Sequence, residues 1–213
     1  MSMIIISHRG YWKLSSEKNT ALAFKRSFSL GYGTETDIRD YKGSLVISHD
    51  IPDESSLSID SFFEIYNQYD VKGPLALNVK SDGLQKLIKE KLNEYKVSNY
   101  FFFDMSIPDT LGYLSEKLNT FVRVSEYETL NDLYEDADGV WIDGFKENII
   151  TESLLEKIIS DGKRACIVSA DLHKNDPATQ WKLLKSFKTN ILQSSNIILC
   201  TDLPEKASEF FYG

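Results

Sequence analysis

The chain has 213 residues and a formal net charge of −8, with 42% hydrophobic and 26% charged residues. This composition is ordinary for a globular protein, and the length suits one domain with a sizeable core. The excess of acidic residues argues against a nucleic-acid partner or an anionic membrane surface, because both attract clusters of Lys and Arg.

The first apolar run, in MSMIIISHRG, is short. A signal peptide needs roughly 7–15 apolar residues and a membrane-spanning helix roughly 20, and we find neither pattern along the chain. We therefore expect a cytoplasmic protein without membrane insertion. Charge and length leave its oligomeric state open.

Short runs rich in β-branched and aromatic residues recur along the chain and predict eight strands. They cover residues 3–7, 33–38, 74–79, 100–105, 120–125, 139–143, 164–169 and 196–201. A further run, SLVISHD at 44–50, follows the second strand after the turn DYKGS, whose glycine allows the chain to reverse. We expect this run to form a small local hairpin with the second strand.

Segments with apolar residues at spacings of three and four lie between the strands and predict helices. They cover residues 20–31, 58–70, 84–95, 108–118, 130–137, 151–162, 179–188 and 205–213. Strands that alternate with helices over eight units favour an α/β protein of the (β/α)8 TIM-barrel class. A doubly wound open sheet is the alternative. We find no linker or internal repeat, so we expect a single compact domain over residues 1–213 with the hairpin as a small insertion.

Ionisable residues follow several predicted strands, and the first two strands carry the most informative ones. Glu35 and Asp37 are two residues apart on one strand, so their side chains point the same way. Two such carboxylates repel each other unless a proton or a cation lies between them, and oxygen ligands suit Mg²⁺ or Ca²⁺. His8 and His49 end neighbouring runs, and a histidine pair beside a divalent cation can act as general acid and base on a phosphoester.

Positive charge for an anionic substrate is available close to the same strand ends. Arg9 follows His8 directly, and Lys80 follows the third predicted strand. Both side chains can donate hydrogen bonds to a phosphate group.

These residues form a pattern similar to that of the glycerophosphodiester phosphodiesterase family, a branch of the phospholipase-C-like phosphodiesterase barrels. The matching segments are HRG at 8–10, NT at 19–20, ETD at 35–37 and HD at 49–50, with LNVK at 77–80 and CTDLP at 200–204 agreeing in layout. The match is strong over residues 3–50 and weaker beyond them.

The resemblance implies a role for each matching residue. His8 and His49 would be the catalytic acid/base pair, Glu35 and Asp37 would hold a divalent cation, and Arg9 with Lys80 would contact the phosphate. The implied substrate is a small phosphodiester.

The sequence departs from the family pattern at two positions. The family usually has Glu two residues before the strand-three lysine, where this chain has Asn78, which offers a carbonyl oxygen without charge. Asp104, after the fourth predicted strand, is a candidate replacement ligand. Lys18 takes a position that is usually acidic in the family.

Two further residues are candidates for substrate contact. Trp141 lies on the sixth predicted strand, where a barrel-core role competes with a substrate platform, and His173 lies in the loop after the seventh.

The sequence is consistent with three hypotheses about function. The first is metal-assisted hydrolysis of a small, glycerophosphodiester-like substrate. The second is intramolecular phosphoryl transfer that yields a cyclic phosphate. The third is a non-catalytic barrel that binds a phosphate ester at a weakened metal site.

Overall fold

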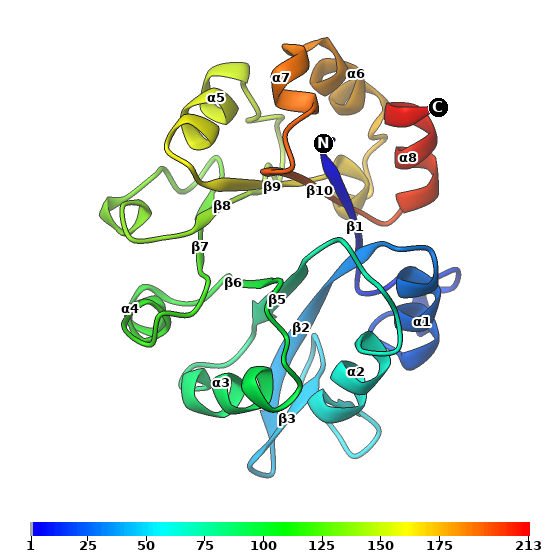
Figure 1. The fold of residues 1–213 in the computed structure, drawn as a ribbon, viewed down its shortest axis with the longest axis vertical. Coiled ribbons are helices and arrows are strands. Elements are labelled where there is room, and N and C mark those ends of the chain that lie inside the picture. Colours follow the sequence, from blue (N-terminus) through cyan, green and yellow to red (C-terminus); the bar gives the residue numbers. More distant parts are fainter. Residues whose placement is uncertain (1) are drawn as a thin grey trace. The chain divides into compact units, whose positions relative to one another are not determined.

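A computed structural model describes residues 2–213, and the chain divides into two compact units. The N-terminal unit comprises Ser7–Thr120, and the C-terminal unit comprises Phe121–Gly213 together with the residues up to Ile6. The expectation of a single domain over residues 1–213 stays a prediction. Figure 1 shows the elements and their labels.

The N-terminal unit alternates strands and helices, beginning with the end of β1 (Ile4–His8). Its other elements are η1 (Ser15–Glu17), α1 (Ala21–Ser29), β2 (Gly33–Tyr41), β3 (Ser44–Ile47), β4 (Leu57–Ser58), α2 (Ile59–Tyr66), β5 (Leu75–Val79), α3 (Gln85–Glu94), β6 (Tyr100–Phe103) and α4 (Ile107–Ser115). β2, β5 and β6 are parallel neighbours, whereas β3 pairs antiparallel with β2.

The predicted hairpin is present between β2 and β3. Lys42 and Gly43, the two turn residues, have φ angles of 49° and 80°. Left-handed backbone at both central positions is the conformation that matches the twist of two antiparallel strands.

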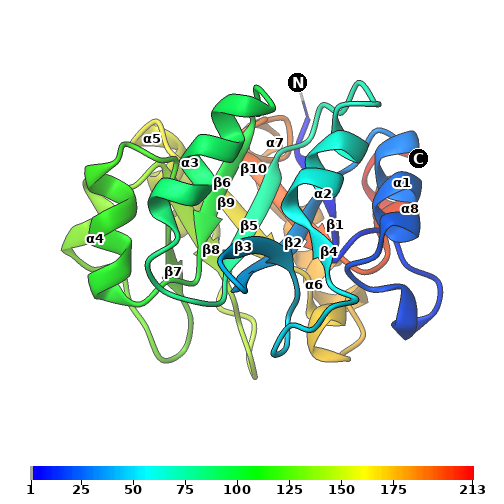
Figure 2. The same ribbon diagram turned by 90° about the horizontal axis from the view of Figure 1, so that it is seen from below.

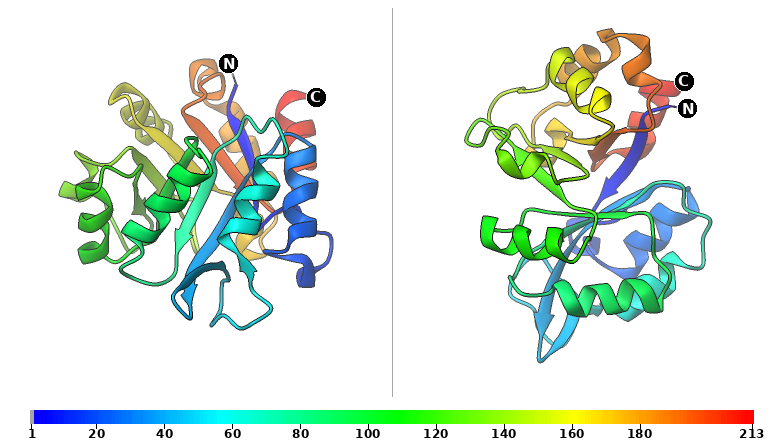
Figure 3. Two further views of the ribbon diagram at one scale, coloured as in Figure 1. Left: turned by 60° about the horizontal axis from the view of Figure 1, so that its bottom comes forward. Right: turned by 60° about the vertical axis from the view of Figure 1, so that its left-hand side comes forward.

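One face of the N-terminal sheet is covered by helices. Ile38 of β2 and Leu77 of β5 join the same buried apolar cluster as Phe24 of α1, Phe62 of α2 and Ile88 of α3. The rings of Phe24 and Phe62 meet edge to face with centroids 4.7 Å apart, and Figures 2 and 3 show α1 and α2 next to each other. Because side chains alternate along a strand, the residues between these apolar ones point to the opposite face of the sheet.

The C-terminal unit carries four parallel strands, β7 (Phe121–Val124), β8 (Gly139–Ile142), β9 (Arg164–Val168) and β10 (Ile197–Thr201), which pair in that order. Its helices are η2 (Asp132–Tyr134), α5 (Glu152–Ser160), η3 (Ala170–His173), α6 (Ala178–Ser186), α7 (Thr189–Leu192) and α8 (Pro204–Tyr212). In α5, Leu155 and Ile158 are fully buried and lie one turn apart.

All eight predicted strands occur, with bounds that differ by up to three residues. The predicted helix over 130–137 is wrong, because only the short turn η2 forms there. The side chain of Asn131 caps this turn by accepting a hydrogen bond from the backbone N–H of Leu133, and β8 already begins at Gly139, which leaves few residues for an α-helix. No helix in residues 2–213 has the length and apolarity needed to span a membrane.

The turn after β1 brings the strand end against α1. Gly10 has a φ of +78°, and a Cβ there would lie 2.7 Å from the Cβ of Ala23. The backbone N–H of Gly10 donates to Thr34 Oγ1 at 2.9 Å, which ties the turn to β2. Glycine is required here both by the backbone angle and by the close approach.

We expect Gly10→Ala to lower the free energy of unfolding by about 1–3 kcal/mol more than Gly31→Ala does. Gly31 has a similar φ of +80°, but a Cβ there would meet nothing within 4 Å. The difference between the two variants therefore measures the cost of the steric clash with Ala23, because the backbone strain is similar in both. Urea unfolding followed by circular dichroism measures both variants, and equal losses would show that the close approach to Ala23 is relieved at no cost.

Candidate active site

Polar side chains gather where β1, β2 and β5 end, on the sheet face opposite the helices. Glu35 and Asp37 lie on that face of β2, and Asn78 lies on the same face of β5, in register with Asp37. Glu35 and Asp37 are 2% and 0% exposed. Burial of two carboxylates costs free energy that a folding role does not repay, so the pair indicates a functional site.

Asp37 is surrounded by hydrogen-bond donors and cations. Its Oδ2 lies 3.1 Å from Nε of Arg9 and accepts a hydrogen bond from Nδ2 of Asn19 at 2.8 Å. Its Oδ1 lies 3.6 Å from Nζ of Lys80. Two protein cations therefore offset the charge of this buried carboxylate.

The negative charge of Glu35 is offset less than that of Asp37. The backbone N–H of Arg9 donates to its Oε2 at 3.3 Å, and Nε2 of His8 lies 3.8 Å from the same oxygen. Burial, followed by the repulsion of the neighbouring Asp37 carboxylate, raises the pKa of Glu35 to about 7. The nearby charges of His8, Arg9 and Lys80 oppose that rise without cancelling it.

Asn19 supports Asp37 from the segment before α1. Its side-chain carbonyl accepts a hydrogen bond from Thr36 Oγ1 at 2.9 Å, and its backbone N–H donates to the carbonyl of Arg9 at 3.0 Å. Its φ of +58° is left-handed, a conformation that asparagine tolerates better than most residues. The sequence placed Asn19 only in a motif, and its contacts with Asp37 and Thr36 could not be read from spacing.

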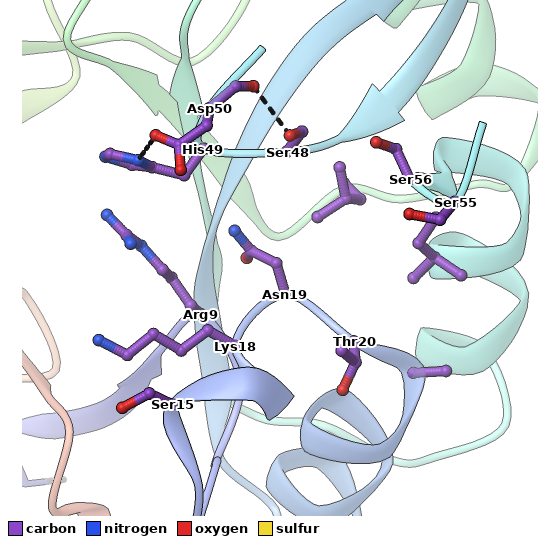
Figure 4. A pocket seen from close by; sticks show the side chains of 13 residues that line it. Arg9, Ser15, Lys18, Asn19, Thr20, Ser48, His49, Asp50, Ser55 and Ser56 are labelled. Atoms are coloured by element: carbon purple, nitrogen blue, oxygen red, sulfur yellow. Dashed lines mark hydrogen bonds and ion pairs between the residues drawn. The ribbon is translucent and has the colours of Figure 1, made fainter. Parts of the chain in front are cut away.

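His49 lies beside a pocket of about 460 Å³, which Arg9 and Asn19 also line. Figure 4 shows the imidazole of His49 on the same side of this pocket as the guanidinium of Arg9. Nδ1 of His49 lies 2.9 Å from Oδ1 of Asp50, and this hydrogen bond is the main cause that lowers the pKa of Asp50. The carboxylate thus orients the ring and leaves Nε2 for a ligand.

The two histidines have different environments. The side chain of His8 is 12% exposed, whereas that of His49 is 42% exposed. His8 faces the buried carboxylate Glu35, and His49 faces the pocket.

Lys80 lies between two carboxylates. Its Nζ is 3.3 Å from Oδ2 of Asp104, in addition to its contact with Asp37. In this structure Asp104 forms an ion pair with Lys80. The role of Asp104 as a metal ligand stays a prediction.

A divalent cation fits the donors at this site. Asp37 Oδ1 and Asn78 Oδ1 are buried and accept no hydrogen bond, and their residues face each other across β2 and β5. With Glu35 they form a set of oxygen donors, which Mg²⁺ and Ca²⁺ prefer. Within residues 2–213 no three His, Cys, Asp or Glu side chains form a metal-binding group.

Trp141 and His173 belong to the C-terminal unit. Trp141 lies on β8 and is 4% exposed, which favours a packing role. Nε2 of His173 is 2.7 Å from Oδ1 of Asp143, and this hydrogen bond raises the pKa of His173. Contact of either residue with a substrate stays a prediction.

Comparison with known proteins identifies the fold. No family model matches the sequence, and no curated protein is significantly similar to it. The structure is similar to a glycerophosphodiester phosphodiesterase from Parabacteroides distasonis, with a TM-score of 0.74, 15% identity, and coverage of 99% of this chain and 97% of that one. It is also similar to an Oleispira antarctica phosphodiesterase solved with sn-glycerol-3-phosphate, with a TM-score of 0.71, 16% identity and coverage of 100% and 98%.

A more distant similarity links the chain to a Ca²⁺-dependent phosphatidylinositol-specific phospholipase C from Streptomyces antibioticus. The TM-score is 0.56 at 10% identity, over 96% of this chain and 95% of that one. The chain has the fold of the glycerophosphodiester phosphodiesterases, and the predicted TIM-barrel class is confirmed.

The raised pKa of Glu35 predicts a pH-dependent stability. The folded state holds the Glu35 proton up to about pH 7, whereas the unfolded chain releases it near pH 4.5, the ordinary pKa of a glutamate. The free energy of unfolding should therefore fall, by up to about 3 kcal/mol, as the pH rises from about 4.5 to 7. Chemical denaturation at several pH values in EDTA measures this slope.

Glu35→Gln is the matched variant, since it keeps the shape of the side chain and removes the titration. We expect its stability to vary less over the same pH range. An identical pH slope in both proteins would show that Glu35 is ionised in the folded state throughout this range.

Proposed function

We propose that the protein hydrolyses a small phosphodiester, of the glycerophosphodiester class, with the help of a divalent cation. The observation that carries the proposal is the convergence of His8, Arg9 and the buried Glu35–Asp37 pair at the ends of β1 and β2. The shared fold supports the same reaction class, although fold alone does not determine function.

Glu35, Asp37 and Asn78 would hold the cation, which supplies positive charge against the developing charge of the phosphate when it is bound. Mg²⁺ and Ca²⁺ both suit these oxygen donors. Asn78 contributes no charge, so we expect a lower affinity than three carboxylates would give.

The histidines would transfer the protons. One of the pair, His8 or His49, would take a proton from the attacking water, and the other would protonate the leaving alcohol. In the hydrogen bond with Asp50, Nδ1–H of His49 donates to the carboxylate, which favours the tautomer with the proton on Nδ1 and leaves Nε2 as a proton acceptor.

Arg9 and Lys80 would bind the phosphate. Both already lie within ion-pair distance of Asp37, so they are held in place before a substrate arrives. Preorganised cations of this kind stabilise charge in the transition state without further rearrangement. Trp141 and His173 remain proposed substrate contacts, and we propose a cytoplasmic location.

The alternative to hydrolysis is that the protein binds a phosphate ester without turning it over, and the ion pairs of Asp37 favour this alternative. Because Arg9 and Lys80 already offset the charge of Asp37, the site can be stable without a cation. Formation of a cyclic phosphate is the other outcome, and phosphorus NMR of the products distinguishes it from hydrolysis.

We expect His8→Ala and His49→Ala each to lower kcat on glycerophosphodiesters by about 10²–10⁴-fold, because each removes a proton-transfer group. The assay is coupled detection of glycerol 3-phosphate with added Mg²⁺ or Ca²⁺. Thermal unfolding of each variant serves as the control for folding. Turnover close to that of the wild type in both variants would rule out the histidine pair.

Asn78→Glu should raise the affinity for Ca²⁺ or Mg²⁺ by about tenfold or more, because it adds a third carboxylate to the donor set. Asn78→Gln is the control, since it lengthens the side chain equally without adding charge. Isothermal titration calorimetry measures both variants. Equal affinities in the two would show that position 78 does not face the bound cation.

A further inference from the structure

The pocket beside His49 contains a lysine with no acidic partner. Lys18 lines this pocket together with Arg9 and Asn19. Its Nζ lies 4.4 Å from the centre of the Trp12 ring. No carboxylate of residues 2–213 pairs with this ammonium group, although the chain as a whole carries a net charge of −8.

The backbone holds Lys18 firmly at the pocket wall. It follows η1 directly, and the next residue, Asn19, is anchored to Asp37, Thr36 and the carbonyl of Arg9. Figure 4 shows the side chains of Arg9 and Lys18 both extending to the left of the view, with Asn19 to their right. The backbone position of Lys18 therefore depends on the same contacts that hold Asp37, and the Trp12 ring contacts its ammonium group.

The other ionisable side chains at the pocket have partners. Arg9 pairs with Asp37, and His49 pairs with Asp50, the one acid among the described residues that line the pocket. The ammonium group of Lys18 is a pocket cation without a carboxylate partner among the described residues. A cation of this kind in a concave site attracts a ligand group of opposite sign.

The pocket also has room and polarity for a headgroup. Its volume of about 460 Å³ is within the range of small-molecule sites. Ser15, Ser55 and Ser56 line it in addition to the charged residues. A small polar alcohol is better suited to these walls than an acyl chain.

We propose that Lys18 selects phosphodiesters whose alcohol carries a second negative charge, in particular a carboxylate. This inference rests on the proposed phosphodiesterase function. Arg9 and the cation site serve the phosphate, and Lys18 receives the additional anionic group. Lys18 is thus a specificity-determining residue, not a proton-transfer residue.

Two glycerophosphodiesters that differ by one carboxylate provide the test, namely glycerophosphoserine and glycerophosphoethanolamine. For the wild type we expect kcat/KM to be about tenfold higher for the serine ester, which a single charge-assisted hydrogen bond can supply. Lys18→Gln should bring the ratio close to one, and Lys18→Glu should reverse it.

Lys25→Gln is the matched control, because Lys25 is an exposed lysine on α1 that does not line the pocket. It removes the same charge from the protein and should leave the ratio at the wild-type value. Turnover of both esters with a ratio near one, or a preference that persists in Lys18→Gln, would overturn the inference and leave the phosphodiesterase function intact.

If the protein turns over neither of the two esters, the proposed function is overturned instead. Calorimetric titration of the same two esters into wild type and Lys18→Gln then decides the inference by affinity. A preference for the serine ester that Lys18→Gln removes would support it, and equal affinities would overturn it.

Discussion

The central constraint on this structure is the burial of two carboxylates side by side on β2. Glu35 and Asp37 have almost no contact with solvent, and they share the sheet face that the helices leave free. Like charges at this spacing raise the energy of the folded state unless other groups offset them. Much of the surrounding structure consists of groups that do so.

Asp37 shows how neighbouring side chains compensate the charge of a buried carboxylate. Arg9 reaches it from the turn after β1, Asn19 from the segment before α1, and Lys80 from the end of β5. Each of these segments is held by backbone bonds to its neighbours, so the charges are fixed before any ligand binds. Glu35 receives less support, and burial together with the neighbouring Asp37 charge raises its pKa to about 7.

The sequence allowed the site to be predicted where it depends on local spacing. The i, i+2 separation of Glu35 and Asp37 places them on one face of a strand, and the position of His8 and Arg9 at a strand end follows from the apolar run before them. The hairpin was predictable for the same reason, because its turn chemistry lies within a few residues.

Features that depend on long-range contacts were not predictable. The pairing of Lys80 with Asp104 joins residues 24 positions apart. The anchoring of Asn19 on β2 likewise joins segments that lie far apart in the chain. The short turn at Asp132–Tyr134 forms in place of the predicted helix because β8 begins at Gly139, a boundary that the apolar spacing of the segment does not reveal.

The decisive measurement is cation-dependent hydrolysis of glycerophosphodiesters by the wild-type protein, followed by phosphorus NMR. We expect a phosphomonoester to form with Mg²⁺ or Ca²⁺, EDTA to stop the reaction, and added cation to restore it. A folded protein that produces no phosphomonoester with either cation, or that hydrolyses the diesters equally well in EDTA, would contradict it.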